Sequence, residues 1–366
     1  MHGPALTPLI GIAVLLLASC TESSEPEFRP TFQQGPCPDD VTHVVLTPVT
    51  CGFLTVPENR SEPGGDTIRL FVTRIEPPGG NPAPDPVLTL GIDLGDTPDY
   101  GGFAPGAQRY NRELILVDQR GTGHSEPTLA CPEVERLGEQ LVGARLSDIE
   151  ARADLQSAVE ACHSRLTGEG IDLSAYNLGE IAADVEDVRR ALGIPRWNIS
   201  SYGSASRIAL EVIRLSPDHV RAMWFDTPQF PQVDELTLGI SGTEHALSQI
   251  SADCAADPAC SRRFPDLSNA LQETLAQLDE EPITATVESP AGAGGHSVRV
   301  VVDGGAFLRA VRAMVSDMEL GMVRRVPAII YGAMEGKVDL VARLLSDEPL
   351  CLGYQPVCGD NPFFEG

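Results

Sequence analysis

The amino-acid sequence predicts an α/β protein with a mostly parallel β-sheet, followed by a mainly helical region. Short apolar runs at 87–92 and 114–118 are typical of strands that are buried on both faces of a parallel sheet. Between residues 178 and 226, expected helices and strands alternate, which is the pattern of parallel crossover units. The chain of 366 residues is 42% hydrophobic and 21% charged, as a globular protein is.

Four strands are expected before residue 120. The first two are joined by a turn-rich stretch at 63–65, and each is bounded by glycine, proline or polar residues. The four expected strands are 51–57, 66–75, 87–92 and 114–118.

Helix and strand signals alternate from residue 178 onward. Apolar residues recur every three or four positions over 178–192, which indicates a helix, and Gly193 supplies a stop signal. Beyond residue 231 the pattern changes to mostly helices with one β-rich patch at 283–302. We therefore assign 37–231 to a core domain and 232–366 to a cap. The remaining expected elements are a strand at 197–201, a helix at 204–215 and a strand at 220–226.

The N-terminal segment indicates export. The apolar stretch Leu9–Leu17 is too short to span a bilayer and fits the hydrophobic region of a signal peptide. It ends in Leu-Ala-Ser-Cys at 17–20, which resembles a bacterial lipobox. We expect a signal peptide at 1–19, lipid on Cys20 and a polar tether over 20–36, with Thr21 favouring an outer-membrane or cell-surface location. A simple secretory signal with an incidental cysteine is the alternative, because no Lys or Arg precedes the stretch.

The cysteines predict disulfides, and the net charge limits the kinds of partner that the chain can bind. Besides Cys20, eight of the nine cysteines fall in pairs that are close in sequence, and an exported protein meets conditions that oxidise them. The histidines are scattered, so no zinc site is expected. A net charge of −26 argues against nucleic acid, whose binding requires basic groups. The expected disulfides are Cys37–Cys51, Cys131–Cys162, Cys254–Cys260 and Cys351–Cys358.

Several separated blocks resemble one family. The residues 117–125 (VDQRGTGHS), 197–199 (WNI), 207–211 (RIALE) and 216–221 (SPDHVR) occur in the order found in exported tripeptidyl-aminopeptidase and proline iminopeptidase-like serine peptidases. These belong to the α/β-hydrolase superfamily. The resemblance covers roughly 37–360 and implies an α/β-hydrolase sheet, acyl-transfer chemistry on short peptides and no cofactor.

The resemblance breaks at the catalytic serine. The family has a Gly-x-Ser-x-Gly turn between strand and helix, the nucleophile elbow, and matching without gaps from 197 to 217 places Gly203 at the serine position. The small residues Ser201 and Ala205 flank it, so the turn is expected to form. Glycine has no side chain and cannot attack a substrate. A shifted register with Ser204 or Ser201 as the nucleophile is the alternative.

A second break concerns the oxyanion hole. The family's Gly-Gly-Pro-Gly-type loop is replaced at 91–96 by Gly-Ile-Asp-Leu-Gly-Asp, so its backbone donors would come from Ile92, Asp93 and Ser204. A carboxylate there opposes the negative charge that the hole must stabilise. The alternative is that the side chains of Asp93 and Asp96 point into solvent.

The resemblance also implies a catalytic Asp and His after the cap, and neither is found before residue 366. We expect His124 and Asp118 to be structural. We further expect that the family's last strands are missing, that Val220–Asp226 is a sheet edge, and that a partner chain or a further segment covers it.

Three functions follow from these features. The first is an exported lipoprotein whose hydrolase-like domain is catalytically impaired or inactive and binds a ligand such as a short peptide. The second is an active tripeptidyl- or prolyl-aminopeptidase-like hydrolase that uses Ser204 or Ser201 and a triad completed by a C-terminal segment outside this chain. The third is a purely structural or adhesive lipoprotein.

Overall fold

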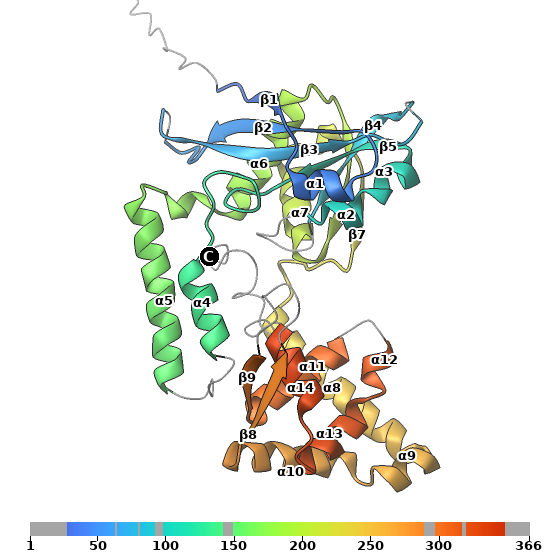
Figure 1. Cartoon of the computed structure of the whole chain (residues 1–366). Coiled ribbons are helices and arrows are strands. Elements are labelled where there is room, and N and C mark those ends of the chain that lie inside the picture. Colours follow the sequence, from blue (N-terminus) through green and yellow to red (C-terminus); the bar gives the residue numbers. More distant parts are fainter. Residues whose placement is uncertain are drawn as a thin grey trace, which may run out of the picture.

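The computed structural model describes residues 28–62, 64–79, 81–91, 98–141, 149–288, 297–316 and 320–347. The expected signal peptide, Cys20, the pair Cys351–Cys358 and the loop residues Ile92 and Asp93 lie outside these ranges. Figure 1 shows two bodies, a sheet with its helices and a mostly helical second body, joined by the segment after β7.

Within the described residues, seven strands form one mixed sheet in the order β1-β2-β3-β5-β4-β6-β7. The first three strands and β5 pair in antiparallel fashion, whereas β5, β4, β6 and β7 run parallel to one another. The fold is therefore the predicted α/β class. The strands are β1 (Thr31–Gly35), β2 (Val49–Pro57), β3 (Thr67–Ile75), β4 (Ala83–Leu90), β5 (Arg112–Val117), β6 (Trp197–Tyr202) and β7 (Val220–Asp226).

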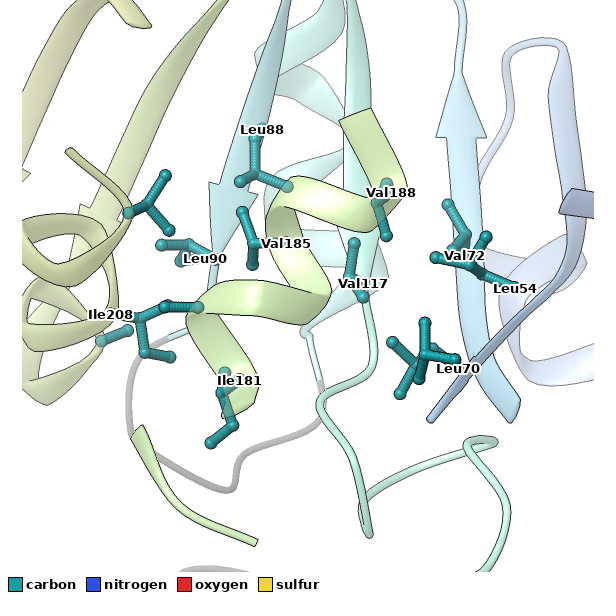
Figure 2. Packing of buried hydrophobic residues seen from close by; sticks show 14 of the residues in the cluster. Leu54, Leu70, Val72, Leu88, Leu90, Val117, Ile181, Val185, Val188 and Ile208 are labelled. Atoms are coloured by element: carbon teal, nitrogen blue, oxygen red, sulfur yellow. The ribbon is translucent and has the colours of Figure 1, made fainter. Parts of the chain in front are cut away.

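Helices cover both faces of this sheet, which is why the buried stretches of β4 and β5, 87–90 and 114–117, are almost entirely apolar. On one face α6 (Leu178–Ala191) and α7 (Ser206–Leu215) pack on Leu88 and its neighbours, as Figure 2 shows. On the other face three short helices pack around Phe71 and Leu114. These are α1 (Asp39–Val44), α2 (Tyr100–Phe103) and α3 (Pro105–Tyr110).

Two further helices, α4 (Pro132–Leu141) and α5 (Ile149–Gly168), form a hairpin beside the sheet (Figure 1). A disulfide between Cys131 and Cys162 joins them at its base. Short 3₁₀ helices at Leu173–Ala175, Gly203–Ala205 and Pro217–His219 link the larger elements.

The second body has its own hydrophobic core, built from residues between 254 and 345. It is mainly helical with one two-stranded sheet, as the sequence predicts. Its elements are α8 (Glu235–Ala256), α9 (Pro258–Arg263), α10 (Leu267–Glu280), β8 (Ile283–Glu288), β9 (Ser297–Val302), α11 (Gly304–Ser316), α12 (Leu320–Val323), α13 (Val326–Met334) and α14 (Asp339–Asp347). No helix in the described ranges is both long and apolar enough to cross a bilayer.

Three of the four expected disulfides are confirmed: Cys37–Cys51, Cys131–Cys162 and Cys254–Cys260. The expected polar tether over 20–36 is wrong in its C-terminal part, because Thr31–Gly35 forms β1 and pairs with β2. This strand lies at the sheet edge with mostly exposed side chains, so it has no apolar pattern to reveal it. At the opposite edge β7 pairs only with β6 among the described strands. That another chain or segment covers Val220–Asp226 stays a prediction.

Candidate functional site

The turn between β6 and α7 is the centre of the candidate site. Its sharp bend is at Gly203, whose φ of 50° lies in the left-handed region, and the helix begins directly afterwards. A residue with a Cβ atom adopts this conformation only at a cost, whereas glycine does so freely. The bend thus falls at the residue that the ungapped match places at the nucleophile position.

Hydrogen bonds anchor the turn to the segment that follows β7. The carbonyl oxygen of Gly203 accepts hydrogen bonds from the Gln229 backbone N–H at 3.2 Å and from the Ser206 hydroxyl at 2.7 Å. The Ser206 hydroxyl oxygen in turn accepts the Gln229 N–H at 3.0 Å. This bracing orders the turn without any contribution from a side chain at 203.

The two alternative nucleophiles lie beside the bend, and both are buried. Ser201 is the next-to-last residue of β6, is 1% exposed, and its hydroxyl has no hydrogen-bond partner in the described structure. Ser204 follows the bend and is 9% exposed. Ser201 therefore lies inside the sheet, packed under α7, rather than at the surface of the turn.

The loop that would supply the oxyanion donors leaves the sheet next to the turn. Leu90, the last residue of β4, pairs in parallel register with Ser201 of β6. The ends of the two strands are therefore adjacent at the same edge of the sheet. Ile92 and Asp93 come after Leu90 and Gly91 in the sequence but lie outside the described residues, so the geometry of their donors stays a prediction.

Aromatic side chains gather on one side of the turn, a feature that the sequence did not predict. The ring of Tyr202 lies 5.3 Å from Phe103 of α2 and 6.5 Å from Trp224 of β7, measured between centroids. Tyr110 of α3 lies 6.3 Å from Trp224. Trp224 is 47% exposed. We call Phe103, Tyr110, Tyr202 and Trp224 the aromatic cluster. No sequence motif marks these four residues, and the sequence shows only that aromatic residues are scarce, at 5%.

The loop after β5 carries a polar cluster near α2. Asp118, which is almost fully buried, accepts hydrogen bonds from the Tyr100 hydroxyl and from the His124 backbone N–H. Burial, and then the carboxylate of Asp118, raise the pKa of the Tyr100 phenol. The hydrogen bond to Asp118 raises the pKa of His124 above its usual value.

In the same loop Arg120 has a structural position. Its guanidinium is fully buried and bonds to both carboxylate oxygens of Asp184, at 2.7 and 2.8 Å. It also donates to the carbonyl oxygens of Glu58 and Ala175, both at 2.6 Å. Arg60 reaches Asp184 as well, at 2.7 Å. This network fixes the loop to α6 and to the end of β2. The Arg120 guanidinium therefore does not face the turn after β6.

In the described ranges no cluster of three or more His, Cys, Asp or Glu residues could hold a metal ion.

A family model described as "alpha/beta hydrolase fold" matches residues 95–258. Carboxylesterase B of Mycobacterium tuberculosis is 27% identical over 258 residues, covering 62% of this chain and 46% of its own. Tripeptidyl aminopeptidase of Streptomyces coelicolor is 26% identical over 204 residues, covering 52% and 37%. Serine protease Hip1 of M. tuberculosis is 25% identical over 254 residues, covering 65% and 48%.

The chain therefore spans less than half the length of these curated relatives. Among solved structures, a probable hydrolytic enzyme of Pseudomonas aeruginosa matches 80% of this chain and 67% of its own at 14% identity, with a TM-score of 0.32. Carboxylesterase CesB of Bacillus subtilis matches at 15% identity, covering 58% of this chain and 56% of its own, with a TM-score of 0.30.

The sheet, the turn after β6 and the sequence matches define the class as an α/β protein with a strand–turn–helix elbow. The chain has an α/β-hydrolase-type fold, residues 95–258 match the model of that family, and its curated relatives include peptidases and esterases.

Proposed function

We propose that this α/β-hydrolase domain binds short peptides without hydrolysing them, as part of an exported lipoprotein. The observation that carries the proposal is Gly203: the bend between β6 and α7 is at a residue with no side chain. In a serine protease, removal of the nucleophile alone lowers the rate on the order of a million-fold.

The aromatic cluster supports binding as the retained function. Trp224 is half exposed beside Tyr202, which is the residue directly before the bend. Rigid aromatic rings contribute much contact area to a ligand at a small cost in conformational entropy. The peptide as ligand is taken from the family likeness.

An active hydrolase is the second candidate function. Ser204 is the next residue along the chain and Ser201 keeps the local Ser-Tyr-Gly string, so either could serve in a shifted register. The burial of the Ser201 hydroxyl inside the sheet disfavours it, because a nucleophile must reach the substrate carbonyl.

Titration calorimetry and product analysis on the same samples test the proposal. The full chain is mixed with a panel of tripeptide amides, and bound peptide and released product are both measured. We expect binding without product, and at least about tenfold weaker binding for Trp224→Ala, which removes a large contact surface. Leu46→Ala is the matched control, since Leu46 is 91% exposed and lies outside the aromatic cluster.

Product release that is abolished by Ser204→Ala would establish the active hydrolase instead. Absence of binding across the panel would refute the peptide ligand. The lipid anchor is tested separately by labelling cells with radioactive palmitate, where wild type is expected to incorporate label and Cys20→Ser is not. Unlabelled wild type would refute the anchor.

A further inference from the structure

His124 lies between two carboxylates, one at each ring nitrogen. Its Nδ1 atom is 3.3 Å from Oδ2 of Asp118, and its Nε2 atom is 3.3 Å from Oδ2 of Asp40. The two partners differ in exposure: the Asp118 side chain is 1% exposed, and the Asp40 side chain is 62% exposed. Asp118 belongs to the loop after β5, whereas Asp40 belongs to α1.

This geometry favours a proton on both ring nitrogens. A neutral imidazole has one N–H donor and one lone pair, and an ionised carboxylate accepts hydrogen bonds but donates none. Neutral His124 can thus satisfy one carboxylate while its lone pair faces the other. Only the imidazolium donates to Asp118 and Asp40 together.

We infer that His124 is a protonation-dependent latch that holds α1 against the loop after β5. When His124 loses its proton, the remaining N–H stays with Asp118, because a ring lone pair that faces a buried carboxylate is repelled more strongly than one that faces a carboxylate in water. Asp40 is well exposed and can be hydrated instead. The contact that opens is therefore the one to α1.

Release of α1 affects the candidate site through α2, which contacts both. A Cβ atom on Gly101 of α2 would lie 3.3 Å from the Cβ atom of Val44, so the two helices are in close contact. Further along α2, the Phe103 ring packs on Tyr202 beside the bend. Opening of the latch loosens the support of the aromatic cluster, and this last step alone rests on the proposed function.

The groups that face His124 come from four elements. They are Asp118 from the loop after β5, Asp40 from α1, the Tyr100 hydroxyl from α2 and the ring of Phe71 from β3. The hydrogen bond to Asp118 raises the pKa of His124 above 6.5. The latch is therefore closed at pH values below the ordinary imidazole pKa. It opens as the pH rises through the higher pKa that His124 has in the folded protein.

Hydrogen exchange of the full chain tests the latch without any ligand. Protection of the backbone amides at 39–46, corrected for the intrinsic rate, is compared at about pH 5 and about pH 8.5, on either side of the histidine range. We expect about two- to fivefold higher protection at the lower pH, the range that ion pairs with an exposed partner give. Asp40→Asn and His124→Gln should show the low value at both pH values.

His43→Gln is the matched control, because His43 lies in the last turn of the same helix and is exposed. This variant should keep the full pH dependence. The latch is refuted if the pH dependence survives in Asp40→Asn or His124→Gln, or if His43→Gln abolishes it. Since no ligand or turnover is measured, failure of the proposed function leaves this result unaffected.

Discussion

Replacement of Gly203 by alanine probes the backbone of the elbow directly. With φ at 50°, the residue occupies the left-handed region, where a Cβ atom costs about 1–2 kcal/mol. For a domain of about 150–250 residues each kcal/mol shifts the unfolding midpoint by roughly 2–4 °C, so we expect a loss of about 2–8 °C. Asparagine tolerates this conformation better, and Gly203→Asn should lose less than Gly203→Ala.

Thermal unfolding followed by tryptophan fluorescence is the assay, because Trp197 is fully buried in the strand that leads into the bend. Gly242→Ala is the matched control. Gly242 lies inside α8 with no atom near its missing Cβ, so alanine should stabilise the helix by about 0.5–1 kcal/mol. If Gly203→Ala were as stable as wild type, the bend would not require a left-handed residue and the reasoning would be wrong.

Three further changes test how the core is held together, each measured by chemical denaturation. Ser201→Ala should be neutral or stabilising by up to about 1 kcal/mol, because its buried hydroxyl has no partner; a clear loss would show a hidden role. Arg120→Ala should cost about 3–5 kcal/mol, since it leaves the buried Asp184 with Arg60 alone and removes the donor to two carbonyl oxygens; a loss below 1 kcal/mol would contradict the network. Removing the disulfide of Cys131, with a sequence separation of 31, should cost about 1.5 kcal/mol more than removing that of Cys254, with a separation of 6; equal losses would rule out the loop-entropy explanation.

Most of the fold could be predicted from the sequence because burial leaves a pattern. The central strands β4 and β5 are covered on both faces, so their buried stretches 87–90 and 114–117 are almost entirely apolar and the strand bounds fall within a few residues of those expected. Strand β1 could not be found in this way. It pairs through its backbone at the sheet edge, where exposed polar side chains are tolerated.

The candidate site was predictable only in part. The position of the bend followed from an ungapped match of residues 197–217, and glycine itself is the residue that such a turn favours. The aromatic cluster and the latch were not predictable. Phe103, Tyr202 and Trp224 meet only because α2, β6 and β7 fold together, and Asp40 reaches His124 only through the packing of α1.

The central claim is that the elbow of this chain has no nucleophile, and reaction of the full gene product with a fluorophosphonate probe tests it most directly. Intact-mass analysis after the reaction is predicted to show no adduct. A stoichiometric adduct mapped to Ser204 or Ser201 would contradict the claim and identify the protein as an active serine hydrolase.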